Sequence, residues 1–174
     1  MPGIVGLITR IPREIAERQL LRMVESIRHE HSYVSGTLID EVLGVYVGWT
    51  ARKGSFSEGM PLHNEGQDTS LVFSGEEFSD PETIRRLKNR GHTFAANGPS
   101  YLIHVYEDDP AFPASLNGRF HGLLFDRKRQ TTMLFNDRYG MQRIYYHVAK
   151  DAFYFAAEAK AILKVCPELR SADP

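Results

Sequence analysis

The chain has 174 residues, a length that suits one domain with a core of useful size. Hydrophobic residues make up 42% and charged residues 25%, and the net charge of −1 gives no reason to expect nucleic acid or a membrane surface as partner. No apolar run approaches the length of a membrane span, and the first residues lack the features of a signal peptide, so the cytoplasm is the expected compartment.

The first part of the chain is predicted to form a strand, a helix and two further strands. Residues 3–9 are a short apolar run typical of a buried strand. Apolar residues recur on one face of residues 12–28, which predicts a helix. Its predicted inward positions are Ile15, Leu20, Leu21, Met23, Val24 and Ile27. Residues 36–40 and 42–50 predict strands, and the polar, Gly-containing stretch 53–66 predicts a loop.

The rest of the chain is predicted to contain further strands, two hairpins and three helices. Residues 71–73 are typical of a buried strand, and Asp80-Pro81 begins a helix that stops at Gly91. The remaining predicted elements are helices over 99–106 and 157–164 and the strand pairs 119–125 with 131–135 and 144–148 with 153–156. Many short strands with few helices indicate an α+β fold with largely antiparallel sheets.

The cysteine and histidine residues offer little sign of a catalytic or metal site. Cys166 is the one cysteine, which excludes an intramolecular disulfide, and it is expected to be a buried, inert thiol. His29 and His31 could ligate a metal, but a polar helix end explains them better. The other histidines show no ligand spacing, and no metal site is predicted; they are His63, His92, His104, His121 and His147. A hydrogen-bonded core histidine is the favoured interpretation of His121.

Six segments together resemble a known family. They are residues 1–7, 61–62, 74–76, 118–126, 136–146 and 155–163. In this order they are similar to the N-terminal glutaminase domain of glutamine-hydrolysing asparagine synthetases, which are class II glutamine amidotransferases. The resemblance covers nearly the whole chain, and it implies an N-terminal-nucleophile (Ntn) hydrolase-like, four-layer αββα sandwich of two antiparallel sheets. Residues 1–174 are then expected to be a single type 2 glutamine amidotransferase-like domain, the N-terminal part of a longer asparagine-synthetase-like protein.

The resemblance also implies where glutamine would bind, and this chain departs from the family there. In the family an N-terminal cysteine attacks the glutamine amide with its own α-amine as base, and here that position holds Pro2. The oxyanion-binding asparagine becomes Ser74, while the backbone N–H of Gly75 is expected to stay available. The arginine that pairs with the α-carboxylate becomes Trp49, a neutral indole. The aspartate that accepts from the α-ammonium becomes Gly98.

Neighbouring residues offer weak replacements. Arg52 follows Trp49 by three residues, an odd offset that points it to the opposite face of a strand. Ser100 or Asn97 could act as a neutral acceptor in place of the aspartate. Residues 29–33 stand where the family has an H-R-G-P-D loop, and that loop is also altered.

One further segment is expected to have a structural role. The resemblance implies that residues 136–146 support the interdomain face of the family. Tyr139, Tyr145 and Tyr146 are therefore expected to be core and interface aromatics. Asp137-Arg138 is expected to be a structural ion pair or turn.

The favoured prediction is a catalytically silent glutaminase-like domain that packs on a downstream ligase domain of the same polypeptide or dimerises. This chain lacks the S-G-G-x-D-S pyrophosphate loop, so no cofactor is expected in it, and ATP and magnesium belong to the ligase domain that the resemblance implies. Two alternatives stay open. One is a remodelled amidotransferase that releases ammonia from glutamine with the Pro2 amine or Ser74. The other is a binding module whose altered pocket, with Trp49, holds an apolar or aromatic ligand.

Overall fold

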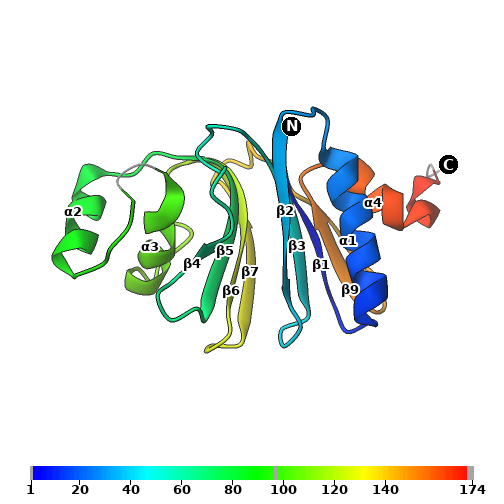
Figure 1. Cartoon of the computed structure of the whole chain (residues 1–174), viewed down its shortest axis with the longest axis horizontal. Coiled ribbons are helices and arrows are strands. Elements are labelled where there is room, and N and C mark those ends of the chain that lie inside the picture. The colour runs from blue at the N-terminus through cyan, green and yellow to red at the C-terminus, as the bar shows by residue number, and fades with distance from the viewer. Residues whose placement is uncertain (1, 96–97, 172–174) are drawn as a thin grey trace. The chain divides into compact units, whose positions relative to one another are not determined.

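The structure is a computed structural model that describes residues 2–95 and 98–171. Contacts between residues divide the chain into two compact units. The first unit comprises the chain up to residue 53 and from residue 143 onward, and the second comprises residues 54–142. Among the described residues there are two antiparallel sheets and four α-helices, so the fold is α+β as predicted (Figure 1).

The first unit is built on a five-stranded sheet in the order β2-β3-β1-β9-β8, with the N-terminal strand at its centre. Its strands are β1 (Gly3–Thr9), β2 (Tyr33–Asp40), β3 (Val45–Arg52), β8 (Tyr145–Val148) and β9 (Ala152–Ala156). Its helices are α1 (Arg13–Ile27), α4 (Ala159–Val165) and the 3-10 turn η2 (Pro167–Arg170). Every pair of neighbouring strands is antiparallel, and the apolar sequence of β1 matches its place between two partners.

Helices α1 and α4 cover one face of this sheet (Figure 1). Val5 and Leu7 of β1 and Tyr46 of β3 point into the core beneath them, so the alternate residues of these strands point to the other face. The predicted inward face of α1 was too wide. Ile15 and Leu21 are exposed, because the helix buries a narrower stripe than the periodicity suggested.

The second unit has a four-stranded sheet in the order β4-β5-β6-β7. Its strands are β4 (Leu62–His63), β5 (Thr69–Glu77), β6 (Gly118–Asp126) and β7 (Thr131–Asn136), and its helices are α2 (Pro81–Asn89), the 3-10 turn η1 (Pro99–Tyr101) and α3 (Leu102–Asp108). The two-residue strand β4 lies in the stretch predicted to be a loop. Edge-to-face and tilted ring contacts fill the core, with ring centroids 5.2 Å apart for Phe73 and Phe120 and 5.3 Å apart for Phe112 and Phe135.

Local signals in the sequence account for the ends of α2. Asp80 caps the helix by accepting a hydrogen bond from the Glu82 N–H at 3.1 Å, and Pro81 occupies its first turn. Gly91 follows with a φ of 91°, a conformation that stops a helix at low cost for glycine. No helix in the described ranges is long and apolar enough to cross a membrane.

Candidate functional site

The position that the resemblance assigns to the nucleophile lies at the end of the central strand of the first unit. Pro2 is half-buried and directly precedes β1. Gly3 pairs with Thr50 of β3, and the Ala157 N–H donates to the Ile4 carbonyl at 2.8 Å, so partners on both sides hold this end of the strand. Proline brings neither a thiol nor an N–H to this place.

The one sulfhydryl of the chain lies in the helix-covered core. Cys166 is 4% exposed, follows α4 and packs in the core beneath α1 and α4. Burial raises the pKa of its thiol, which disfavours the reactive thiolate. The expectation of a buried thiol is confirmed.

Trp49 fills the space on the sheet face that α1 and α4 leave uncovered. It lies on β3 between Ile4 of β1 and Gly36 of β2, directly opposite both. The residue is 6% exposed, and a Cβ placed on Gly36 would come within 2.4 Å of the indole Cζ2. Strand β3 continues to Arg52, whose odd offset directs it to the other face. Arg52 therefore does not supply a cation where Trp49 lies.

A carboxylate next to this end of β1 is held by basic side chains. Glu158 precedes α4, and its Oε1 lies 2.7 Å from His29 Nε2, while its other oxygen lies 3.2 Å from Lys160 Nζ. Burial disfavours the charged form, but hydrogen bonds that include those from His29 and Lys160 outweigh it and lower the pKa of Glu158 to about 2. His29 thus pairs with an acid just beyond the end of α1, and His31 is exposed.

At the predicted oxyanion site of the second unit, the backbone N–H of Gly75 is already bound by Ser57, a residue that the sequence did not indicate. Gly75 has a φ of 120°, and a Cβ there would lie 2.1 Å from the Arg119 carbonyl, so this bend requires glycine. Its N–H was expected to stay available. Instead it donates to the buried Ser57 hydroxyl at 3.0 Å, and that hydroxyl donates to the Gly75 carbonyl at 3.0 Å. The expectation is wrong because a residue 18 positions away supplies the acceptor.

Ser74 lies beside a buried histidine. It is buried on β5 and stands directly opposite His121 of β6, so the two side chains share one face of the sheet. Burial lowers the pKa of His121 to about 4, although a hydrogen bond with the Gln142 backbone and the charge of Asp137 favour its protonation. His121 is therefore neutral near pH 7, as expected of a hydrogen-bonded core histidine.

Gly98 opens the short turn η1 with a φ of 102° and leaves open space where a Cβ would stand. Glycine itself brings no carboxylate to this position. The hydroxyl of Ser100 accepts a hydrogen bond from the Ala95 N–H at 3.1 Å, so it is engaged locally. Asn97, the other suggested substitute, lies outside the described residues.

The second unit also has a pocket of mixed polar and apolar lining, which the sequence did not indicate. It has a volume of about 320 Å³, and Glu77, Arg86 and Tyr101 contribute to its lining. The Tyr101 hydroxyl donates to a carboxylate oxygen of Glu77. Burial raises the pKa of Glu77, partly offset by this hydrogen bond, and burial beside that acid also raises the pKa of Tyr101.

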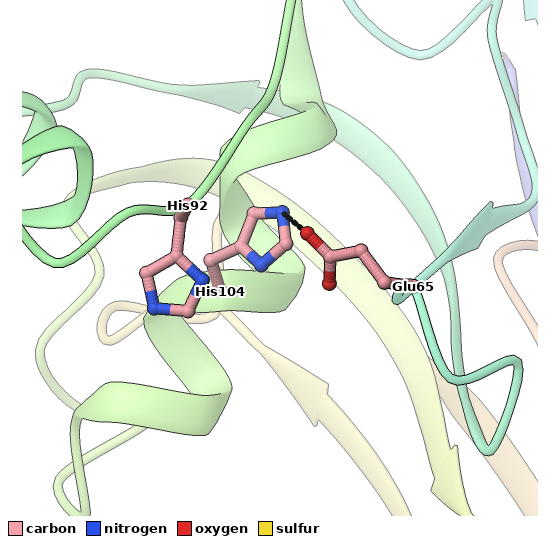
Figure 2. A group of neighbouring side chains, drawn as sticks. All are labelled: Glu65, His92 and His104. Atoms are coloured by element: carbon pink, nitrogen blue, oxygen red, sulfur yellow. Dashed lines mark ion pairs between the residues drawn. The ribbon is translucent and has the colours of Figure 1, made fainter.

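Two histidines that show no ligand spacing in the sequence come together in the second unit. The ring centroids of His92 and His104 are 4.6 Å apart, and Glu65 reaches the same place (Figure 2). The three side chains can each offer one metal-ligating atom. No motif could have indicated this, because the residues come from separate segments.

The aromatic side chains around residue 140 lie at the surface, so the expected core role is wrong and the expected interface role stays a prediction. Tyr139 is 79% exposed and Tyr146 is 67% exposed, so neither belongs to a core. Asp137 is buried and accepts hydrogen bonds from the backbone N–H groups of Tyr139, Met141 and Gln142 at 2.7–3.1 Å. Of the two expected roles for Asp137, the turn is confirmed.

Comparisons with known proteins show the family of the chain. A family model described as "Glutamine amidotransferase domain" matches residues 52–164, well over half of the chain. The chain is 26% identical over 174 residues to asparagine synthetase (glutamine-hydrolysing) 1 of Bacillus subtilis (strain 168), covering 94% of this chain and 27% of that protein. It is 30% identical over 106 residues to asparagine synthetase (glutamine-hydrolysing) 3 of the same organism, covering 60% of this chain and 17% of that protein.

A solved structure of the allosteric regulatory enzyme of purine biosynthesis superimposes with a TM-score of 0.72 at 15% identity, covering 94% of this chain and 43% of that chain. This likeness confirms the predicted Ntn-hydrolase-like fold class. The chain spans about a quarter or less of the two asparagine synthetases. The chain therefore belongs to the family of glutamine amidotransferase domains and is related to the glutaminase domains of asparagine synthetases.

Proposed function

We propose that this glutamine amidotransferase domain no longer hydrolyses glutamine and that it has a structural role beside an ATP-dependent amide ligase domain of the same polypeptide. The observation that carries the proposal is the location of the one thiol. Cys166 is buried beneath the helices, whereas Pro2 stands at the end of β1 where the family has its nucleophile. In a serine protease, loss of the nucleophile alone lowers kcat by on the order of 10⁶.

The substrate-binding groups support the same proposal. Trp49 is a buried neutral ring in place of a cation, and Gly98 has no carboxylate to accept from an ammonium group. The N–H of Gly75 already has Ser57 as its acceptor. A thiol added at residue 2 would therefore not restore the groups with which the family holds the α-carboxylate and the α-ammonium of glutamine.

Exposed aromatic side chains support a role in docking. Strand β8 is an edge strand of its sheet, and Tyr146 and Val148 are largely exposed on it. In the second unit Tyr139 and Met141 are also exposed. Exposed aromatic and methionine side chains are enriched where proteins meet partners, and the proposed partner is the ligase domain that asparagine synthetases carry.

A glutaminase assay tests the proposal. The purified chain is incubated with L-glutamine, and glutamate and ammonia are both measured, beside the variants Pro2→Ala and Pro2→Cys. Mass spectrometry establishes which residue begins each protein. All three proteins should release no ammonia above the protein-free rate. Release by the unaltered chain that Pro2→Ala abolishes would refute the proposal.

A remodelled hydrolase is the second candidate, and one observation favours it. Ser74 faces the neutral His121 across the β5–β6 pair, and a serine with a neighbouring neutral imidazole is a known way to build a nucleophile. Ammonia release that Ser74→Ala abolishes and Pro2→Ala leaves unchanged would establish this candidate. If the domain is a binding module, the pocket at Glu77 and Tyr101 is a better ligand site than the sheet face at Trp49, because the indole already packs against Gly36. Thermal-shift screening with polar metabolites tests it.

A further inference from the structure

Three side chains that could share a metal ion come from separate segments of the second unit: Glu65, His92 and His104. Glu65 follows β4, His92 follows the Gly91 turn after α2, and His104 lies on α3. One candidate ligand atom from each lies within 4.8 Å of the other two. Figure 2 shows the two imidazole rings side by side, with the Glu65 carboxylate directed at His104. The donor set is two imidazoles and one carboxylate.

His104 is held in the orientation that a metal ligand needs. Its side chain is 5% exposed, and its Nδ1 lies 3.0 Å from Glu107 Oε2. The other oxygen of Glu107 accepts from Asn64 Nδ2 at 2.9 Å, which fixes that carboxylate. The second ring nitrogen, Nε2, then faces Glu65 Oε1 at 3.8 Å. A carboxylate on one nitrogen of a histidine, with the other nitrogen free to bind, is the usual support of a metal-ligating histidine.

The second imidazole is also placed among acids. His92 Nε2 lies 3.4 Å from Asp108 Oδ1, and its Nδ1 lies 4.0 Å from Glu107 Oε2. Asp108 is itself paired with Arg90 at 2.9 Å. The ring plane of His92 is tilted by 34° from that of His104. Two imidazoles this close would repel each other if both were protonated, whereas a shared cation between neutral rings would compensate the surrounding carboxylates.

We propose that Glu65, His92 and His104 bind a divalent first-row transition metal such as Zn²⁺, with Glu107 positioning His104. Two imidazoles and a carboxylate suit zinc better than the oxygen-seeking Mg²⁺ or Ca²⁺. The Glu65 side chain is 61% exposed, so it can turn inward and bring its oxygen to bonding distance of an ion near the rings. The bound ion would tie the turn after β4 and the segment after α2 to α3, which is a structural role.

Zinc titration of the whole chain tests the proposal. The protein is prepared without a polyhistidine tag, treated with chelator, and titrated with ZnCl₂ by calorimetry while its melting temperature is followed. One ion per chain should bind and raise the melting temperature. Glu107→Gln should weaken zinc binding by about 10- to 100-fold through loss of support for His104. His31→Ala, which removes an exposed histidine of the first unit, is the matched control and should leave binding unchanged.

The ligand variants decide the outcome. His104→Ala should abolish saturable binding, and Glu65→Gln and His92→Gln should weaken it strongly. The side chains of Glu65 and His92 lie outside the core, so these two variants should fold even if His104→Ala does not. They can therefore decide the test on their own. Cobalt bound in place of zinc should give visible absorption bands that disappear in His92→Gln. Absence of saturable binding, binding that survives both His92→Gln and Glu65→Gln, or binding that His31→Ala removes would overturn the proposal.

Discussion

Trp49 packs directly on Gly36. We therefore predict that a methyl group at residue 36 is tolerated only when a smaller ring replaces the indole at residue 49. A Cβ on Gly36 would stand 2.4 Å from Cζ2 and 2.7 Å from Cη2 of the indole. Overpacking of this kind costs about 1–3 kcal/mol. Against it, alanine restricts the unfolded chain more than glycine does, which favours folding by about 0.4–1 kcal/mol. Gly36→Ala should therefore lower the free energy of unfolding by roughly 1–2 kcal/mol.

The double-mutant cycle uses Trp49→Phe, which removes the outer ring of the indole. In that background Gly36→Ala should be neutral or slightly stabilising, giving a coupling energy of about 1–3 kcal/mol. Urea unfolding measures each free energy. Fluorescence of Trp49, the one tryptophan, reports on the proteins that keep it, and circular dichroism reports on all four.

Gly48→Ala is the matched control for this cycle. Its added Cβ would stand 2.2 Å from Val24 Cγ2, on the face that α1 covers, so the variant should also be destabilised. Trp49→Phe should not relieve that clash, and the two changes should add within about 0.5 kcal/mol. If Gly36→Ala costs the same with Trp49 and with Phe at that position, the indole does not fill the space as described.

Two further predictions concern the second unit. Gly75→Ala should destabilise the chain by at least about 2 kcal/mol, because φ is 120° and the Arg119 carbonyl leaves no room for a Cβ. The control Gly59→Ala adds a Cβ in open space and should change the thermal unfolding little. Equal effects of the two variants would contradict this prediction. Burial lowers the pKa of His121 from 6.5 to about 4 in the folded chain. Below pH 6.5 the unfolded chain binds a proton at this residue that the folded chain does not bind. The free energy of unfolding therefore falls as the pH drops from 6.5 toward 4, by at most about 1.4 kcal/mol per pH unit. Urea unfolding at pH 7 and pH 5 should therefore show a larger loss in the unaltered chain than in His121→Leu, and parallel losses would count against a neutral buried His121.

Elements that carry their own local signals were predictable from the sequence. The apolar run of β1 and the ends of α2, set by Asp80 and Gly91, are examples. Strand β4 was not, because two residues are too few to show a periodicity. The sequence predicted too many buried residues on α1, because it does not show how much of a helix the sheet will cover.

The candidate site shows the same division between local and distant information. The lack of a thiol at Pro2 can be read directly from the chain. The acceptor for Gly75 could not be, because Ser57 reaches it from a loop 18 residues away. The approach of His92 to His104 also depends on how α3 packs, and a spacing of twelve residues with different elements between matches no ligand motif.

The buried position of Cys166 gives the chain an internal reporter of helix movement. A thiol reagent can modify this residue only when α4 and the segment after it swing away from α1, since the side chain is enclosed beneath them. The rate of modification in native buffer therefore measures how often this layer opens. Because no second cysteine competes for the reagent, one mass increment per chain reports that single opening event.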